Sequence, residues 1–190
     1  MGGAIGDIGT HAANLAEYIT GSEITEICAM LNAVVKGRKL DDDCSMLLRF
    51  DNGASGVLMA TQVAAGEENN LNIRIYGEKG GLEWKQEDPN TMILKWLDRP
   101  KEIVRAGQKY LSDDAKAFTR TPAGHPEGYL EAFANIYRSF TRAVRDYKPG
   151  KKMNIAKYDF PDVADGVRGM NFVQTAVKSA SSTRKWTTLK

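Results

Sequence analysis

The chain has 190 residues, of which 42% are hydrophobic and 26% charged, and its formal net charge is +2. That length can bury one substantial core, while the balanced charge argues against a specialist for nucleic acid or a membrane surface. Two cysteines, Cys28 and Cys44, are too few for a disulfide framework or a zinc site, and no apolar run reaches membrane-spanning length, so we expect a soluble, cytoplasmic protein.

A glycine-rich stretch opens the chain and leads into a predicted helix. Apolar residues recur at helical spacing over residues 8–20, and Gly21 stands where such a helix would end. Asp7 stands at the N-cap position, and His11 follows four residues later, so that both side chains point the same way. A carboxylate beside an imidazole at a glycine-lined helix start, with backbone N–H groups available for an anion, is typical of an acid–base site.

The same two residues have plainer interpretations. Asp7 can be a cap alone, and His11 a polar residue on a packed helix. A metal site is a third interpretation, but a catalytic metal needs a third protein ligand, and the chain has only one other histidine, His125. The spacing leaves these alternatives open.

Residues 23–106 show the alternating pattern of β-strands. Asn52-Gly53 predicts a hairpin turn, because this pair tolerates the positive φ that a tight turn needs. The acidic run at residues 41–43 is interpreted as a solvated turn, since a divalent-metal loop would need more widely spaced oxygen ligands. We expect five or six strands in series to form a mostly antiparallel meander. The strand-like runs lie at residues 24–35, 44–50, 54–63, 71–76, 82–84, 92–97 and 102–105.

The last third of the chain predicts two helices. Residues 107–124 have no sustained period and are expected to form a loop. An aromatic stripe at helical spacing predicts a helix over residues 129–147, with its aromatic side chains in the core. A further helix is expected to open at Pro161, and residues 185–189 to form a closing strand.

Three sequence segments of the chain resemble one protein family. Gly-Gly-Ala-Ile-Gly-Asp-Ile-Gly-Thr-His at residues 2–11 is similar to the start of the C-terminal domain of the Gfo/Idh/MocA oxidoreductases, the relatives of glucose–fructose oxidoreductase and inositol dehydrogenase. The family pattern Gly-x-x-x-Asp-x-Gly-x-His matches from Gly3 to His11. Ile-Tyr-Gly-Glu-Lys-Gly-Gly-Leu-Glu-Trp at residues 75–84 and Phe-Pro-x-Val-x-Asp-Gly-Val-Arg-Gly-Met-x-Phe at residues 160–172 match as well.

The resemblance implies one α+β domain over residues 1–190, with an open, mostly antiparallel mixed sheet and helices on one face, as in dihydrodipicolinate-reductase-like C-terminal domains. The helix at residues 8–20 would lie at the junction to a nucleotide-binding domain. No Gly-x-Gly-x-x-Gly follows a predicted strand, and the family's Glu-Lys-Pro motif with its catalytic lysine is absent. We therefore expect either a fragment or a free-standing domain, which alone binds NAD(P) weakly and does not turn over.

Site residues follow from the same resemblance. His11 would be the general base or acid for a hydroxyl of a sugar or cyclitol, and Asp7 would position the substrate. Gly-His-Pro-Glu-Gly-Tyr-x-Glu-Ala-Phe-Ala-Asn-Ile-Tyr at residues 124–137 is typical of a sugar-acting branch, in which this loop lies at the mouth of the substrate site. The expected substrate contacts are His125, Thr10, Glu127 and Tyr129.

Cofactor and partners are also implied by the resemblance. The full-length parent would use NAD or NADP, held by its other half, and no metal site is expected. Homodimers or homotetramers would form through the open sheet face, and neither nucleic acid nor a membrane is expected as a partner. One alternative is a non-catalytic oligomerisation or scaffold module derived from such an enzyme, and another is a non-redox relative that uses the same pocket for hydrolysis or isomerisation.

Overall fold

The computed structural model describes residues 2–189, which fall into two compact units. The first unit contains residues 2–68 and 163–189, and the second contains residues 69–162. Both are α+β, as predicted, and every strand pair among the described residues is antiparallel. That residues 1–190 act as one functional domain stays a prediction.

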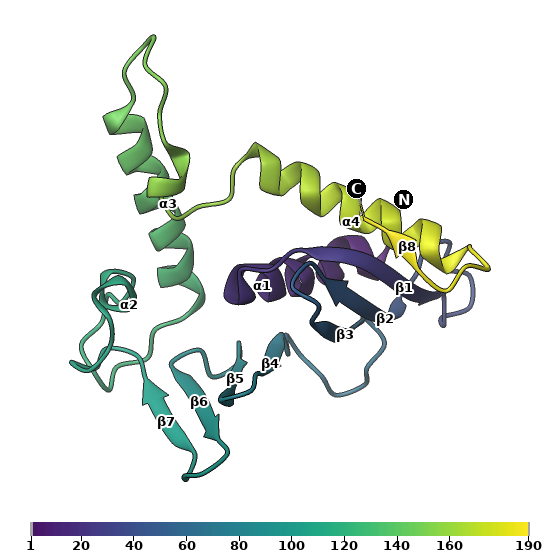
Figure 1. Ribbon diagram of the computed structural model, residues 1–190, viewed down its shortest axis with the longest axis horizontal. Helices are drawn as coiled ribbons and strands as arrows, with labels where there is room; N and C mark the ends of the chain where they lie inside the picture. The colour runs from purple at the N-terminus through teal and green to yellow at the C-terminus, as the bar shows by residue number, and fades with distance from the viewer. Residues whose placement is uncertain (1, 190) are drawn as a thin grey trace. The chain divides into compact units, whose positions relative to one another are not determined.

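The first unit is a four-stranded sheet with helices on one face (Figure 1). The strand order is β3-β2-β1-β8. The elements, in chain order, are η1 (Ile5–Gly9), α1 (Thr10–Thr20), β1 (Ile24–Asn32), β2 (Asp43–Phe50), β3 (Ser55–Thr61), α4 (Val163–Ala180) and β8 (Thr187–Thr188).

The core of this unit lies between the sheet and its helices. Strand β2 turns Cys44, Met46 and Leu48 inward, because alternate residues of a strand face the same side. They pack with Ile5 from the first helical turn and Phe172 from α4. Burial raises the pKa of the Cys44 thiol to about 11, so this cysteine is a packing residue and not a reactive one.

The opposite face of the same sheet carries apolar side chains that the described residues leave exposed. Val57 is 78% exposed. Met59 on the same strand is exposed as well, as are Leu47 on β2 and Met30 on β1. An exposed apolar sheet face is typical of an interaction surface.

The second unit is built on another antiparallel sheet, in the order β4-β5-β6-β7 (Figure 1). Its strands are followed by a short helix, a long helix and a 3₁₀ turn. The elements are β4 (Asn72–Tyr76), β5 (Gly80–Lys85), β6 (Thr91–Trp96), β7 (Glu102–Arg105), α2 (Asp113–Ala117), α3 (Tyr129–Asp146) and η2 (Ile155–Lys157).

The strands form two sheets where the sequence pattern indicates one meander. Residues 62–71 separate them, because this segment holds Gly66 at φ +88° and a polar run at 67–70 that has no apolar side chain to bury. The helix α2 was not expected, although Ser112 caps it by accepting a hydrogen bond from the Ala115 N–H.

The aromatic stripe of α3 does not form a core as predicted. Tyr129 is 71% exposed, and Phe133 and Phe140 are exposed as well. The buried side of this helix instead carries Asn135 and Ser139 with Ala143. Asn135 explains the difference, because its amide binds the loop that follows α2 and draws that loop onto the polar side of the helix.

The acidic run at residues 41–43 is not a solvated turn. Asp41 binds the start of the chain, as described below, and Asp42 is only 1% exposed. The Asp42 carboxylate accepts hydrogen bonds from the N–H groups of Val34 and Val35, at 2.6 and 3.0 Å. Because this turns the chain away from the sheet, β1 ends at Asn32 and not at Val35 as predicted.

These hydrogen bonds predict that stability depends on pH through Asp42. The Val34 and Val35 N–H groups hold the pKa of Asp42 below its ordinary value of 3.8. A carboxyl with a lowered pKa stabilises the folded state above its ordinary pKa, and that contribution is lost as the pH falls through the lowered value. Asp42→Asn should therefore lower the melting temperature at pH 7 by roughly 5 °C and flatten the fall in stability below about pH 4.

Thermal or urea unfolding between pH 2 and 7 would measure both effects. Asp43→Asn is the matched control, since among residues 2–189 the Asp43 carboxylate accepts one long hydrogen bond, from the Asn32 side-chain amide at 3.3 Å. An acid limb as steep in Asp42→Asn as in the unchanged chain would remove Asp42 as its cause.

None of the helices formed by residues 2–189 is long and apolar enough to cross a membrane.

Candidate functional site

The first candidate site lies where the chain enters α1. Helical structure begins at Ile5 with the π-helical turn η1, earlier than the sequence predicts. Asp7 lies inside this turn and makes no cap hydrogen bond, so its N-cap assignment is wrong. A π-helical turn within a helix is common at functional sites, because it displaces one side chain from the regular face. The predicted end at Gly21 is confirmed, with φ +63°.

Asp41 caps the helix in place of Asp7. Its carboxylate accepts hydrogen bonds from the N–H groups of Gly3 and Ile5, at 2.6 and 2.8 Å. Its carbonyl oxygen accepts from the Ala4 N–H at 2.8 Å. The backbone donors expected to hold an anion are therefore occupied by a side chain of the protein itself.

Asp7 and His11 are both exposed and follow each other by about one helical turn. Asp7 is held in place by Gln62, whose side-chain amide donates to the carboxylate at 2.8 Å. Gln62 is itself fixed after β3, since its N–H donates to the Asp42 carbonyl at 2.8 Å. The carboxylate is therefore oriented by the sheet, while the imidazole of His11 is open to a ligand.

Thr10 stands between these two residues and is half-buried. It faces α4, because a methyl group added at Gly169 would meet the Thr10 hydroxyl oxygen at 3.6 Å. Of the predicted residues in this unit, Asp7 and His11 are thus brought together on the surface, and Thr10 is turned toward the packed side.

The second candidate site is a cavity of about 570 Å³ beside the N-terminus of α3. It brings together three of the predicted substrate contacts, His125, Glu127 and Tyr129. Carboxylates, an amide and a guanidinium complete its polar wall, contributed by Glu87, Asp88, Asn90, Arg105 and Glu131. The cavity suits a ligand rich in hydroxyl groups, which both donate and accept hydrogen bonds.

The Glu127 side chain shapes this cavity by holding its loop. Its carboxylate accepts hydrogen bonds from the N–H groups of Arg120 and Thr121, at 2.6 and 3.2 Å, and from the Thr121 hydroxyl at 3.0 Å. The Glu127 carbonyl accepts from the Asn90 amide at 2.8 Å. Glu127 therefore has few lone pairs left for a substrate.

His125 and Tyr129 are the exposed members of the set. The His125 Nδ1 lies 3.2 Å from the Pro122 carbonyl oxygen, and this contact orients the ring. The other ring nitrogen, Nε2, forms no hydrogen bond with residues 2–189. The Tyr129 ring packs against Phe133, with 4.8 Å between the ring centroids. Both residues line the cavity.

Sequence reasoning missed the residues that orient the predicted ones. Gln62, Asp41 and Asn90 act through backbone or carboxylate contacts with residues distant in the sequence. No local spacing rule could have found them, because each partner lies on another element. Within residues 2–189 no group of three metal-binding side chains comes together.

The chain is similar to a known protein family and to several of its members. Residues 1–83 match the family model described as the GFO/IDH/MocA C-terminal domain. The chain is 42% identical to an oxidoreductase from Sinorhizobium meliloti whose crystal structure superimposes with a TM-score of 0.88, over 96% of this chain and 51% of that one. It is 29% identical over 188 residues to the uncharacterized oxidoreductase YfiI of Bacillus subtilis strain 168, covering 98% of this chain and 48% of that protein.

A third relative has been solved with ligands. It is an inositol dehydrogenase homolog from Azotobacter vinelandii, complexed with NADH and myo-inositol, and is 31% identical with a TM-score of 0.89. The match covers 96% of this chain and 49% of that one. The chain thus spans about half the length of the relatives that it matches.

Proposed function

We propose that this chain, which belongs to the Gfo/Idh/MocA family as its C-terminal domain, is the substrate-binding part of an NAD(P)-dependent dehydrogenase of sugars or cyclitols. The observation that carries the proposal is the exposed pair Asp7 and His11 on one helical turn, with Asp7 oriented by Gln62. The relative complexed with NADH and myo-inositol supports the substrate class and the cofactor.

The chain supplies the proton-transfer half of such a reaction. Oxidation of a secondary alcohol to a ketone removes a proton from the hydroxyl oxygen and a hydride from its carbon. The imidazole of His11 would accept the proton, and the Asp7 carboxylate would hold a neighbouring hydroxyl and so orient the ring. In the reverse direction His11 would return the proton to the carbonyl oxygen.

The hydride half lies outside the described residues. Dinucleotides bind at the carboxyl ends of parallel strands that begin with a glycine-rich turn, whereas all strand pairs formed by residues 2–189 are antiparallel. These residues do not fit a nicotinamide dinucleotide, and the cofactor would be held by a separate nucleotide-binding domain.

The cavity beside α3 supports a hydroxyl-rich substrate. His125, Asn90 and Arg105 offer donors on its wall, and Glu87 and Asp88 offer acceptors. A cyclitol or sugar alternates hydroxyl groups around a ring and can satisfy both kinds of group at once. We include His125 and Tyr129 among the substrate contacts of the proposed enzyme, and Glu127 as the residue that holds their loop. Thr10, beside His11 on α1, is proposed as a substrate contact of the first site.

The test is a substrate screen on the enzyme that joins this chain to a nucleotide-binding domain. NADH or NADPH formation is followed with myo-inositol, monosaccharides and 1,6-anhydro sugars, and with simple secondary alcohols as the control. The proposal expects turnover for a ring polyol and none for 2-propanol. Turnover of simple alcohols alone, or of no member of the panel while the cofactor binds, would contradict it.

A scaffold or oligomerisation module is the second candidate function. The exposed apolar face that includes Val57 and Met59 favours it, because such a face is covered by a partner in most soluble proteins. We propose that it mediates a homodimer or homotetramer. Light scattering on the same preparations separates the candidates, since a scaffold would assemble without any polyol turnover, whereas the dehydrogenase would do both.

A further inference from the structure

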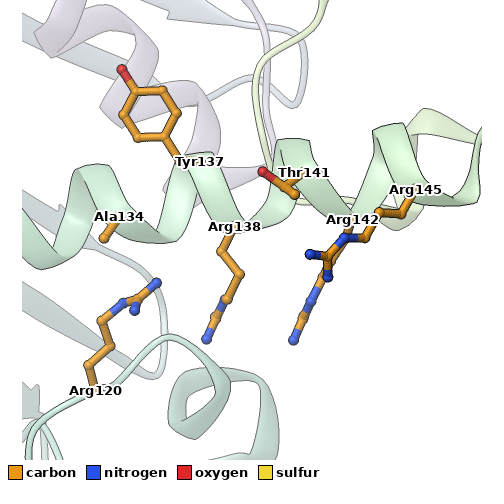
Figure 2. Close-up of a pocket in the computed structure, with 7 residues that line it drawn as sticks. All are labelled: Arg120, Ala134, Tyr137, Arg138, Thr141, Arg142 and Arg145. Atoms are coloured by element: carbon orange, nitrogen blue, oxygen red, sulfur yellow. The ribbon is translucent and has the colours of Figure 1, made fainter.

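One face of α3 carries a cluster of arginines that forms no ion pair within residues 2–189. Arg138, Arg142 and Arg145 follow each other at helical spacing of four and three residues, which places them on one side of the helix. Arg120 reaches the same place from the loop after α2, and together they line a cavity of about 610 Å³. Figure 2 shows Arg138 and Arg142 projecting from one side of α3 toward the loop that bears Arg120.

The helix places no acidic residue one turn before or after Arg138. The positions one turn before and after Arg138 hold Ala134 and Thr141, where a surface helix commonly places Glu or Asp. Asp146 stands one turn beyond Arg142, but its carboxylate accepts a hydrogen bond from the Tyr158 hydroxyl at 2.6 Å and lies 3.9 Å from the Lys157 ammonium. In the described part of the chain, none of the four arginines forms an ion pair.

Two of the guanidinium groups are fixed in place by the protein. The Arg120 Nε donates to the Asn135 side-chain oxygen at 2.9 Å, and Asn135 is itself buried. Arg138 donates to the Ala117 carbonyl oxygen and lies over the Phe118 ring, 5.4 Å from its centroid. Both arginines are therefore preorganised, which lowers the entropy cost of binding a ligand.

The arrangement costs free energy in two ways, and an anion would offset the second of them, the repulsion between like charges. The Nε of Arg138 is buried and has no hydrogen-bond partner among the described residues, and a buried donor without a partner is unfavourable. Burial, together with the charges of Arg142 and Arg120, lowers the pKa of the Arg138 guanidinium. Like charges held together without an acid indicate a site for a negative ligand.

We propose that Arg120, Arg138, Arg142 and Arg145 bind a phosphoryl group of a small molecule. A phosphoryl group carries close to two negative charges and presents oxygens in several directions, so it can accept from guanidinium groups that arrive from both the loop and the helix. A carboxylate is planar with one charge, and one guanidinium satisfies it. The proposal concerns residues that the dehydrogenase proposal does not use, so either can fail alone.

The test titrates the 190-residue chain with pyrophosphate in chloride buffer at low ionic strength. Calorimetry measures the affinity, and the Nε–H signals of ¹³C,¹⁵N-labelled arginine identify the residues that respond. We expect saturable binding, and at least about a tenfold weaker affinity for Arg142→Gln, because a hydrogen bond to a charged group contributes that much. Arg142 is exposed, so its replacement should leave folding intact, which circular dichroism verifies.

Arg74→Gln is the control, since it removes the same charge from an exposed strand residue of the same unit. Its affinity should stay within about twofold of the unchanged chain. Equal losses in both variants would show diffuse attraction and overturn the proposal, as would the absence of saturation by about 10 mM. Inorganic phosphate and a hexose 6-phosphate, titrated in parallel, separate a free anion from a sugar ester as the source of the phosphoryl group.

Discussion

Replacing His11 with alanine is expected to lower kcat by about two to four orders of magnitude in the enzyme that contains this chain. That loss corresponds to about 2.7–5.4 kcal/mol of transition-state stabilisation. His11 is exposed near a carboxylate that Gln62 holds in place, and in the proposed reaction it takes the hydroxyl proton as the ketone forms. Without it, the hydroxyl oxygen must lose its proton to water while the attached carbon loses a hydride.

The measurement is steady-state turnover of the ring polyol found by the substrate screen. Asn14→Ala is the matched control, because Asn14 is also exposed on α1 and lies three residues further along; its turnover should change by less than about twofold. Added imidazole should restore part of the activity of His11→Ala, an effect that a merely structural histidine would not show. Unchanged turnover of His11→Ala would remove this residue from the mechanism.

The elements of the fold were largely predictable from residue patterns. The Asn52-Gly53 turn, the alternation in β2 and the glycine stop of α1 are local features, and the structure confirms them. The division into two sheets was not, because strand periodicity tells which residues form strands and not which strands pair. Gly66 and the polar run at residues 67–70 were the local signs of that division.

The placing of Asp7 and His11 together on one exposed stretch of helix was predictable, and the residues that support them were not. Asp7 and His11 follow from spacing and from the resemblance to the family, whereas Asp41 and Gln62 lie 36 or more residues away from the residues that they bind. A carboxylate that caps a helix from another loop leaves no signature at the helix itself. The same limit applies to Asn135, whose amide decides which side of α3 is covered.

The hydrogen bonds between Asp41 and the start of the chain predict different effects of alanine at Gly3 and at Gly6. A Cβ added at Gly3 would lie 2.0 Å from the Asp41 carbonyl oxygen, a backbone atom that cannot move aside without breaking its bond to the Ala4 N–H. At Gly6 the nearest atom to an added Cβ is a methyl carbon of Val173 at 3.8 Å, an ordinary contact. The two positions therefore respond to the same substitution in opposite directions.

Gly3→Ala is expected to destabilise the fold by about 2–3 kcal/mol, because the backbone must separate from Asp41. Gly6→Ala should be neutral or stabilising by up to about 1 kcal/mol, since alanine favours the helix and restricts the unfolded chain. Urea unfolding of both variants measures the difference. Equal stability of the two variants would show that Asp41 does not hold the turn in solution.

The same two variants test whether the hydrogen bonds of Asp41 also affect substrate binding. The Gly3 carbonyl accepts hydrogen bonds from the N–H groups of Gly6 and Asp7, at 3.0 Å each, so moving Gly3 displaces the turn that presents the Asp7 carboxylate. In the folded fraction of Gly3→Ala we expect KM for the polyol to rise by about tenfold, while Gly6→Ala keeps the KM of the unchanged enzyme. A stability loss in Gly3→Ala with KM unchanged would mean that Gln62 alone orients Asp7, and that the turn matters for folding but not for substrate binding.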